Sequence, residues 1–219
     1  MLGFNALAAT IYDDNASYNG NSFSMTNGQS FGNEISLTPN VWTLTNFTIE
    51  YYAPSSLAST IGLDIRFYQN DGTPENGFPT PGTLFYDSGW YFGIGGGGLP
   101  GSGFQVVTYN TSTLDFSSGA LVPLTITLPG DFTFVVTYTN TAGSSLSSLQ
   151  SPLANDQAGI SYGDYWVENS GVWTLRTNSI SAANLVVDFG GTVPEPSVFG
   201  LGAIGGALLF GINKLRRKS

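Results

Sequence analysis

Apolar and polar residues alternate along most of this chain, and that period of two restricts the fold more than any other feature. In residues 61–68 the odd positions are Ile, Leu, Ile and Phe, whereas the even positions are Gly, Asp, Arg and Tyr. The same alternation returns in residues 124–128 and 132–138. Successive side chains of a strand point to opposite faces, so the pattern predicts half-buried β-strands.

The remaining strand candidates lie between clusters of Gly, Pro, Asn and Asp, which are the residues that favour turns. No segment before Val198 has the spacing of an amphipathic helix. About eight to eleven short strands without helical crossovers predict an all-β chain, folded as an antiparallel β-sandwich with a jelly-roll-like topology. The further predicted strands are residues 83–92, 104–110, 160–167, 172–177 and 184–189.

Two local patterns add detail to this prediction. Between Trp42 and Tyr51 the apolar residues move from even to odd positions, which predicts a β-bulge near Thr45 and Asn46. Residues 128–131, Leu-Pro-Gly-Asp, have the sequence of a type II turn in which glycine supplies the positive φ. Tight hairpins prefer the mirror-image turn types, so the two flanking strands are expected in opposite sheets.

The composition excludes several classes of function. The chain has no histidine and no cysteine, so it lacks the usual general base, zinc ligands, thiol nucleophiles and disulfides. In residues 1–193 only Arg66 and Arg176 are basic, against fourteen acidic residues, which gives a net charge of −12. Such a surface has almost nothing to neutralise phosphates, so no nucleic-acid partner is expected.

The C-terminal end consists of three parts in sequence. Prolines on both sides of one glutamate keep the backbone extended before the next segment. The uncharged residues 198–213 predict a short transmembrane helix of roughly 24 Å, against a hydrocarbon core of about 30 Å. The basic residues behind it are expected on the cytoplasmic side. The three parts are Pro194, Glu195 and Pro196, the uncharged run from Val198 to Ile212, and the cluster of Lys214, Arg216, Arg217 and Lys218.

This order resembles the Pro-Glu-Pro C-terminal sorting tag (PEP-CTERM) of exported proteins in Gram-negative bacteria that secrete exopolysaccharide. The resemblance covers about the last 27 residues. It implies processing near Pro194-Glu195-Pro196 by a membrane transpeptidase of the exosortase type. Before processing, the apolar helix would hold the protein in membrane lipid, and afterwards the protein would reach the outer surface or the matrix. The body resembles, more loosely, the β-rich ectodomains often found ahead of this tag.

The N-terminal residues fit export in part. Ala6-Leu7-Ala8 has the small-x-small pattern of a signal-peptide cleavage site, so residues 1–9 are interpreted as the remnant of a signal peptide that starts upstream. The alternative is a short ordered first strand of a cytoplasmic protein. The predicted organisation is a signal remnant at 1–9, a β-sandwich at 10–190, a stalk with the sorting motif at 191–197, a transmembrane helix at 198–213 and a basic cytoplasmic tail at 214–219.

Aromatic residues beside carboxylates form the first candidate site. Exposed rings of this kind stack on the apolar C–H groups of sugars, although packing in the core or at a sheet edge is the alternative for each of them. A pair of carboxylates from Asp64, Asp164 and Glu168 is also what a glycan hydrolase would need. The aromatic candidates are Tyr162, Tyr165, Trp166 and Trp173.

Two loops complete the set of candidate sites. Oxygen-bearing side chains at Asn70, Asp71 and Glu75 are possible calcium ligands, but the same residues are common in ordinary turns and the EF-hand spacing is absent. The glycine-rich residues 93–103 lack the Lys-Ser/Thr pair and the following helix of a nucleotide-binding loop. We expect a flexible surface loop there, and no cofactor apart from the calcium candidate.

These features predict an exported, non-enzymatic protein of the cell surface or extracellular matrix with a structural or adhesive role. The first alternative is a carbohydrate-binding module that engages exopolysaccharide through the aromatic cluster. The second is a carboxylate-based glycan hydrolase. Fold alone does not decide among the three, because function depends on specific sites.

Overall fold

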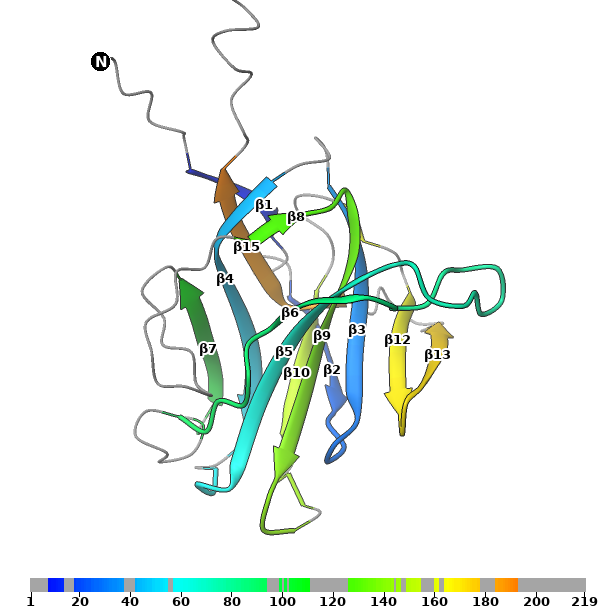
Figure 1. Cartoon of the computed structure of the whole chain (residues 1–219). Coiled ribbons are helices and arrows are strands. Elements are labelled where there is room, and N and C mark those ends of the chain that lie inside the picture. Colours follow the sequence, from blue (N-terminus) through cyan, green and yellow to red (C-terminus); the bar gives the residue numbers. More distant parts are fainter. Residues whose placement is uncertain are drawn as a thin grey trace, which may run out of the picture.

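The structure is a computed structural model, and all of its regular elements in the described residues are β-strands. They form two antiparallel sheets, which confirms the predicted β-sandwich (Figure 1). Within this part of the chain there is no helix that is long and apolar enough to cross a membrane. The structure describes residues 8–13, 18–37, 42–54, 57–93, 99, 101, 103–110, 126–143, 145–146, 149–154, 160–161, 164–177 and 184–192.

The larger sheet, here called sheet I, has eight strands in the described residues and runs in the order β1-β15-β4-β10-β14. Strand β2 pairs with β10, while β7 and β8 both pair with β4. The strands are β1 (Ala8–Asp13), β2 (Tyr18–Ser24), β4 (Trp42–Ala53), β7 (Gly103–Asn110), β8 (Ile126–Leu128), β10 (Gln150–Ala154), β14 (Asn184–Leu185) and β15 (Val187–Thr192).

The smaller sheet, here called sheet II, has seven strands in the described residues and runs in the order β13-β12-β3-β9-β5-β6. Strand β11 pairs with β3 beside this path. The strands are β3 (Ser30–Ser36), β5 (Ile61–Gln69), β6 (Leu84–Asp87), β9 (Asp131–Asn140), β11 (Ile160–Ser161), β12 (Asp164–Asn169) and β13 (Val172–Thr177).

The predicted bulge lies at Thr45. Gly190 pairs with Asn46 and the next residue, Gly191, pairs with Leu44, so Thr45 is the extra residue on β4. The bulge lets Leu44 and Phe47 both point into the core, although three positions separate them.

The connection at residues 128–131 is confirmed in one respect and wrong in another. It links β8 of sheet I to β9 of sheet II, as expected. Gly130, however, is not among the residues with positive φ, so the turn is not of type II. The chain passes from one sheet to the other without closing a hairpin, and the Gly130 carbonyl accepts a hydrogen bond from the Leu37 amide over 2.7 Å.

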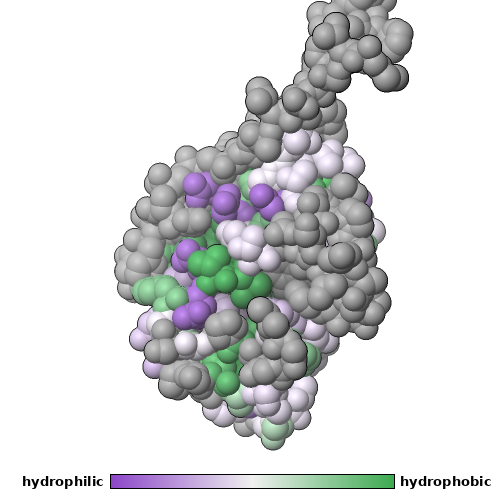
Figure 2. Space-filling model, turned by 90° about the vertical axis from the view of Figure 1, so that its left-hand side faces the viewer, coloured by the Kyte–Doolittle hydropathy of each residue, from purple (hydrophilic) through white to green (hydrophobic). Residues whose placement is uncertain are grey.

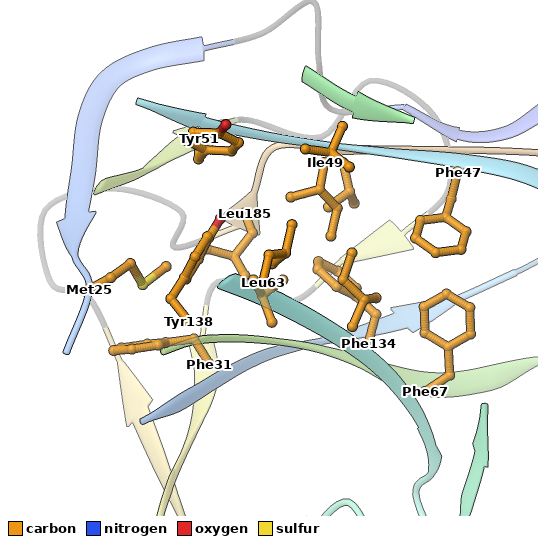
Figure 3. Packing of buried hydrophobic residues seen from close by; sticks show 14 of the residues in the cluster. Met25, Phe31, Phe47, Ile49, Tyr51, Leu63, Phe67, Phe134, Tyr138 and Leu185 are labelled. Atoms are coloured by element: carbon orange, nitrogen blue, oxygen red, sulfur yellow. The ribbon is translucent and has the colours of Figure 1, made fainter. Parts of the chain in front are cut away.

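Aromatic rings from both sheets fill the core between them. Phe67 of β5 meets Phe47 of β4 at 5.3 Å and Phe189 of β15 at 5.7 Å between ring centroids, both edge to face. Figure 3 shows Phe47 and Phe67 facing one another across the two sheets. Such pairs add about 0.5–1.5 kcal/mol each to the stability gained from burial.

The two ends of the described sandwich lie side by side. Ala8, the first residue of β1, pairs with Thr192, the last residue of β15. The sandwich therefore extends two residues beyond each end of the predicted range 10–190, and Ala8 and Ala9 belong to a strand. Cleavage after Ala8 would remove the first residue of that strand.

Two asparagines join the loops at the opposite end of the sandwich. The Asn27 side chain accepts a hydrogen bond from the Asn140 amide over 2.8 Å and donates one to the Gly143 carbonyl over 2.7 Å. Asn140 Oδ1 in turn accepts from Thr60 Oγ1 over 2.8 Å. Three separate connections are thereby fastened to one another at this end.

Candidate functional site

A long excursion between β5 and β6 gives sheet II its most distinctive surface. Residues 70–83, here called the strap, run across the face of sheet II that points away from sheet I and reach its edge strand β13 (Figure 1). At the strap's tip, Glu75 and Phe78 exchange two backbone hydrogen bonds. Glu75 Oε2 also accepts a hydrogen bond over 2.7 Å from the Leu175 amide of β13.

Trp166 lies beneath this surface rather than on it. It points to the outer face of sheet II, because its neighbour Val167 belongs to the core, but only 1% of it is exposed. The residue opposite on β3 is Gly32, where an added Cβ would lie 2.9 Å from Thr133 Cγ2. Trp166 therefore offers no ring face to a sugar, which corrects its assignment to an exposed stacking platform.

Trp173 and Tyr68 meet above the same outer face. Their ring centroids are 5.7 Å apart at 74°, although three strands separate β13 from β5 in the sheet. In a flat sheet four strand spacings would amount to roughly 19 Å, so the sheet must curl toward its outer face to bring the rings together. Both side chains are partly exposed, and this ring pair is here called the aromatic margin.

Of the other two aromatic candidates, the structure describes only Tyr165, which does not join this margin. Tyr165 points inward and packs on Phe23 with a centroid distance of 4.5 Å, and Phe23 packs in turn on Phe31. Tyr162 lies outside the described residues. Of the three predicted aromatic residues that the structure describes, only Trp173 lies where it can offer ring surface to a ligand.

A row of hydrogen bonds crosses sheet II beside the aromatic margin. Thr137 Oγ1 donates to Ser30 Oγ over 2.9 Å, and Ser30 Oγ donates to Glu168 Oε2 over 3.1 Å. The other oxygen of Glu168 accepts a short hydrogen bond from the Gly171 amide. Both carboxylate oxygens of Glu168 are therefore engaged in holding strands β3, β9 and β12 and the turn before β13.

Asp64 is a buried carboxylate, although the alternation of residues 61–68 placed it on the solvent-exposed face of its strand. Only 1% of its side chain is exposed, and its Oδ2 lies 2.6 Å from Arg66 Nη2. Arg66 Nε also contacts Asp87 Oδ2 at 3.0 Å, while Ser88 Oγ donates to Asp64 Oδ1 over 3.3 Å. Burial raises the pKa of Asp64 to about 6; the Arg66 charge opposes this rise and the Asp87 charge adds to it.

A hollow of about 540 Å³ opens at the root of the strap. Burial raises the pKa of the Glu34 carboxyl, and the negative charges of Asp164 and Asp131 raise it further. Burial also raises the pKa of Asp164. The hollow is lined by Glu34, Gln69, Asn70, Asp71, Pro79, Pro129, Gly130 and Asp131.

The calcium candidates use their oxygens within the protein. Asn70 Oδ1 accepts from Thr133 Oγ1 over 2.7 Å, and Glu75 binds the edge strand as described above. Asp71 accepts from both the amide and the hydroxyl of Thr83, at 2.6 and 2.7 Å, and these bonds lower its pKa. Among the described residues, no group of three or more Asp, Glu, His or Cys side chains is placed to hold a metal ion.

Sheet I carries an exposed apolar patch on its outer face. Phe104 and Val106 of β7 are 52% and 55% exposed, and the ring of Phe104 lies 5.2 Å from that of Tyr52 on β4. Figure 2 shows hydrophobic and hydrophilic surface side by side on the flank of the molecule where β7 runs. Exposed apolar side chains that lie together can serve as contact surfaces for other molecules.

Several predicted residues lie outside the described part of the chain. They include most of the glycine-rich loop, the sorting motif and everything after it: Pro194, Glu195, Pro196, Val198, Ile212, Lys214, Arg216, Arg217 and Lys218.

Comparisons of the chain with protein-family models, with curated proteins and with solved structures found no match.

Proposed function

We propose that this chain is an exported surface or matrix protein with a structural or adhesive role, sorted through its C-terminal tag. The observation that carries the proposal is the order of Pro194-Glu195-Pro196, the uncharged residues 198–213 and the basic residues 214–218. We include in it a short transmembrane helix at 198–213 and an exosortase-type transpeptidase as the processing partner.

The position of the tag on the body supports this proposal. Strand β15 ends at Thr192, two residues before Pro194, and it lies between β1 and β4 within sheet I. A strand held on both sides transmits any pull on the tail to the whole sheet. Because Ala8 pairs with Thr192, the chain enters and leaves the body at one end, and the opposite end would face away from the membrane.

The state of the carboxylates supports a non-enzymatic body. Glu168 and Asp71 each accept hydrogen bonds on both oxygens from groups of their own chain. Asp64 is buried against Arg66. A glycosidase needs two carboxylates free to flank a scissile bond, and of the predicted candidates Asp64, Asp164 and Glu168, the first and the last are engaged within the chain.

We assign the body to the jelly-roll class. A jelly roll is a long antiparallel ribbon rolled into two sheets, so its first strand pairs with its last and the pairs continue inward. The eight strands β2, β3, β4, β5, β6, β7, β9 and β10 support this assignment, because β2 pairs with β10, β3 with β9, β4 with β7 and β5 with β6.

The test is intact mass and cell fractionation of the mature protein in a host with and without its exosortase. We expect loss of the residues beyond the Pro-Glu-Pro region only when the enzyme is present. A Glu195→Ala variant should remain unprocessed, whereas Arg217→Lys, which keeps the charge, should be processed normally. A full-length chain that persists with the enzyme present contradicts the proposal and leaves a simple tail anchor.

A carbohydrate-binding role is the second candidate, and the aromatic margin of Trp173 and Tyr68 favours it. Trp173→Ala should weaken binding to the host's exopolysaccharide by roughly two- to tenfold, since one stacked ring contributes about 0.5–1.5 kcal/mol. Phe104→Ala is the matched control, because Phe104 is 52% exposed and belongs to β7 of the other sheet. Equal binding by both variants and the native chain excludes this margin as the glycan site.

A further inference from the structure

Three dipeptides of this chain place a side-chain carbonyl next to a following glycine in described loops: Asn27-Gly28, Asp71-Gly72 and Asn76-Gly77. A glycine amide is unhindered by any Cβ, so it can attack the preceding side-chain carbonyl and close a five-membered imide. The attack requires a free glycine N–H, a free side chain and a backbone able to rotate. The structure distinguishes the three sites by these requirements.

At Asn27-Gly28, hydrogen bonds hold both the side chain and the glycine amide. The Asn27 side chain accepts from the Asn140 amide over 2.8 Å and donates to the Gly143 carbonyl over 2.7 Å. The Gly28 amide, which would be the nucleophile, donates to the Tyr138 carbonyl over 2.9 Å. Several hydrogen bonds must therefore break before the reaction can begin.

Asp71-Gly72 is locked in the same way. Both oxygens of Asp71 accept hydrogen bonds from Thr83. The Gly72 amide donates to the Thr80 carbonyl over 2.9 Å. Neither the electrophile nor the nucleophile is free.

At Asn76-Gly77, the side chain and the glycine amide meet the requirements for the attack. The two residues form the tip of the strap, with φ of 54° at Asn76 and 91° at Gly77, and both are exposed. Only the flanking Glu75 and Phe78 close the turn, through their own backbone hydrogen bonds of 2.9 and 3.0 Å. Within the described residues, neither the Asn76 side chain nor the Gly77 amide has a hydrogen-bond partner.

We propose that Asn76 is a site of spontaneous deamidation at the tip of the strap. The Gly77 nitrogen attacks Asn76 Cγ, the N–Cγ bond forms, the Cγ–Nδ2 bond breaks, and ammonia leaves with the amide proton. Water then opens the imide at one of its two carbonyls. Opening at one side yields aspartate, and opening at the other yields isoaspartate, whose main chain is longer by one methylene.

Deamidation of Asn76 would weaken the contact between the strap and the edge strand of sheet II. Aspartate adds a negative charge beside Glu75, and the longer backbone of isoaspartate cannot fit a two-residue turn. Either change loosens the turn that positions Glu75 Oε2 on the Leu175 amide. That bond satisfies an outward-facing donor of edge strand β13, and an uncovered edge is open to pairing with another strand.

The test compares the folded full-length chain with the same chain unfolded in urea, both kept at one mildly alkaline pH. Peptic peptides are then assayed by mass spectrometry for the exchange of an amide NH₂ for OH and for isoaspartate. We expect Asn76 to react at similar rates in both samples. Asn27 and Asp71 should be slowed on the order of 100-fold in the folded chain, because three hydrogen bonds must open first. Protection of Asn76 as strong as that of Asn27 overturns the proposal.

Hydrogen exchange at the Leu175 amide tests the consequence. The aged native chain should lose protection there, whereas Asn76→Gly, which keeps a two-residue turn but cannot deamidate, should retain it. Equal loss in the variant would assign the change to another event and overturn the link to Asn76.

Discussion

At the scale of single residues, burial decides the state of the carboxylates. Asp64 is 1% exposed and lies 2.6 Å from Arg66, yet burial raises its pKa to about 6; the Arg66 charge opposes this rise and the nearby Asp87 charge adds to it. Such a raised pKa means that folding makes the charged form of the carboxyl less favourable than it is in the unfolded chain. The pKa moves upward in the same way at Glu34, Glu50, Asp164 and Asp188.

These raised pKa values make the stability of the protein depend on pH. A carboxyl whose pKa rises on folding contributes stability that is fully present below its unfolded pKa and is lost as the pH rises through the folded value. The free energy of unfolding should therefore increase by on the order of 1 kcal/mol from Asp64 alone as the pH falls from about 8 to about 5. Urea unfolding across this range measures the effect.

Asp64→Asn supplies the control, because asparagine has nearly the same volume and stays neutral throughout. The variant should show a distinctly shallower pH dependence, whatever its absolute stability. An unchanged slope would mean that other carboxyls account for the whole effect.

A second prediction concerns the loops fastened by Asn27. Asn27→Ala leaves the Asn140 amide and the Gly143 carbonyl without their partner, and should cost about 1–3 kcal/mol. Ser22→Ala removes one exposed side-chain hydrogen bond to Gln150 and should change stability by less than about 0.5 kcal/mol. Chemical denaturation of the two variants gives the comparison, and equal losses would argue against a special role for the asparagine.

At the scale of elements, strand β4 depends on its bulge. Thr45 is skipped in the pairing register with β15, β7 and β8, although its hydroxyl donates to the Gly190 carbonyl over 3.3 Å. Leu44 and Phe47 nevertheless both point inward. The extra residue absorbs the switch of the apolar positions from even to odd, so every apolar side chain of the strand stays on one face.

This geometry predicts opposite outcomes for two single deletions in β4. Removing Thr45 should leave Leu44 and Phe47 on the same face in a regular strand, and the chain should fold with a loss on the order of 1 kcal/mol. Removing Thr48 should put Ile49 and Tyr51 on the face opposite Phe47, and should abolish cooperative unfolding. Circular dichroism with thermal melts separates the two, and a folded Thr48 deletion would contradict the register.

At the scale of the whole molecule, the last strand belongs to the interior of a sheet. Strand β15 lies between β1 and β4, and its Val187 and Phe189 are 0% and 1% exposed. Sheet I is therefore complete only when residues 187–192 pair with β1, which begins at Ala8, and with β4.

Truncation tests this arrangement. A chain that ends at Thr192 should melt at the same temperature as the full-length protein, since the strand order of the sandwich is complete. A chain that ends at Val186 should fail to fold, because β1 and β4 lose their common neighbour and the core loses Phe189. A folded protein without residues 187–192 would show that β15 is dispensable.

Local patterns determined much of this protein from the sequence alone. Alternation located strands such as Ile61–Gln69, the switch of parity located the bulge at Thr45, and the Pro-Gly step at residues 129–130 located a crossing between sheets. Each of these signals depends on which face of one segment is buried, and that information lies within a few residues.

Contacts between distant segments decided the rest, because no local pattern encodes them. Alternation placed Asp64 on a wet face, and the clustering of aromatics beside carboxylates made Trp166 a candidate for an exposed sugar-binding ring, yet both are buried on the outer side of sheet II. The local sequence indicates only a turn at Glu75, whereas the folded strap brings its carboxylate to the Leu175 amide, one hundred positions away. The sequence determined which residues form strands, and the tertiary structure decided which strand faces stay covered and which side chains remain free to react.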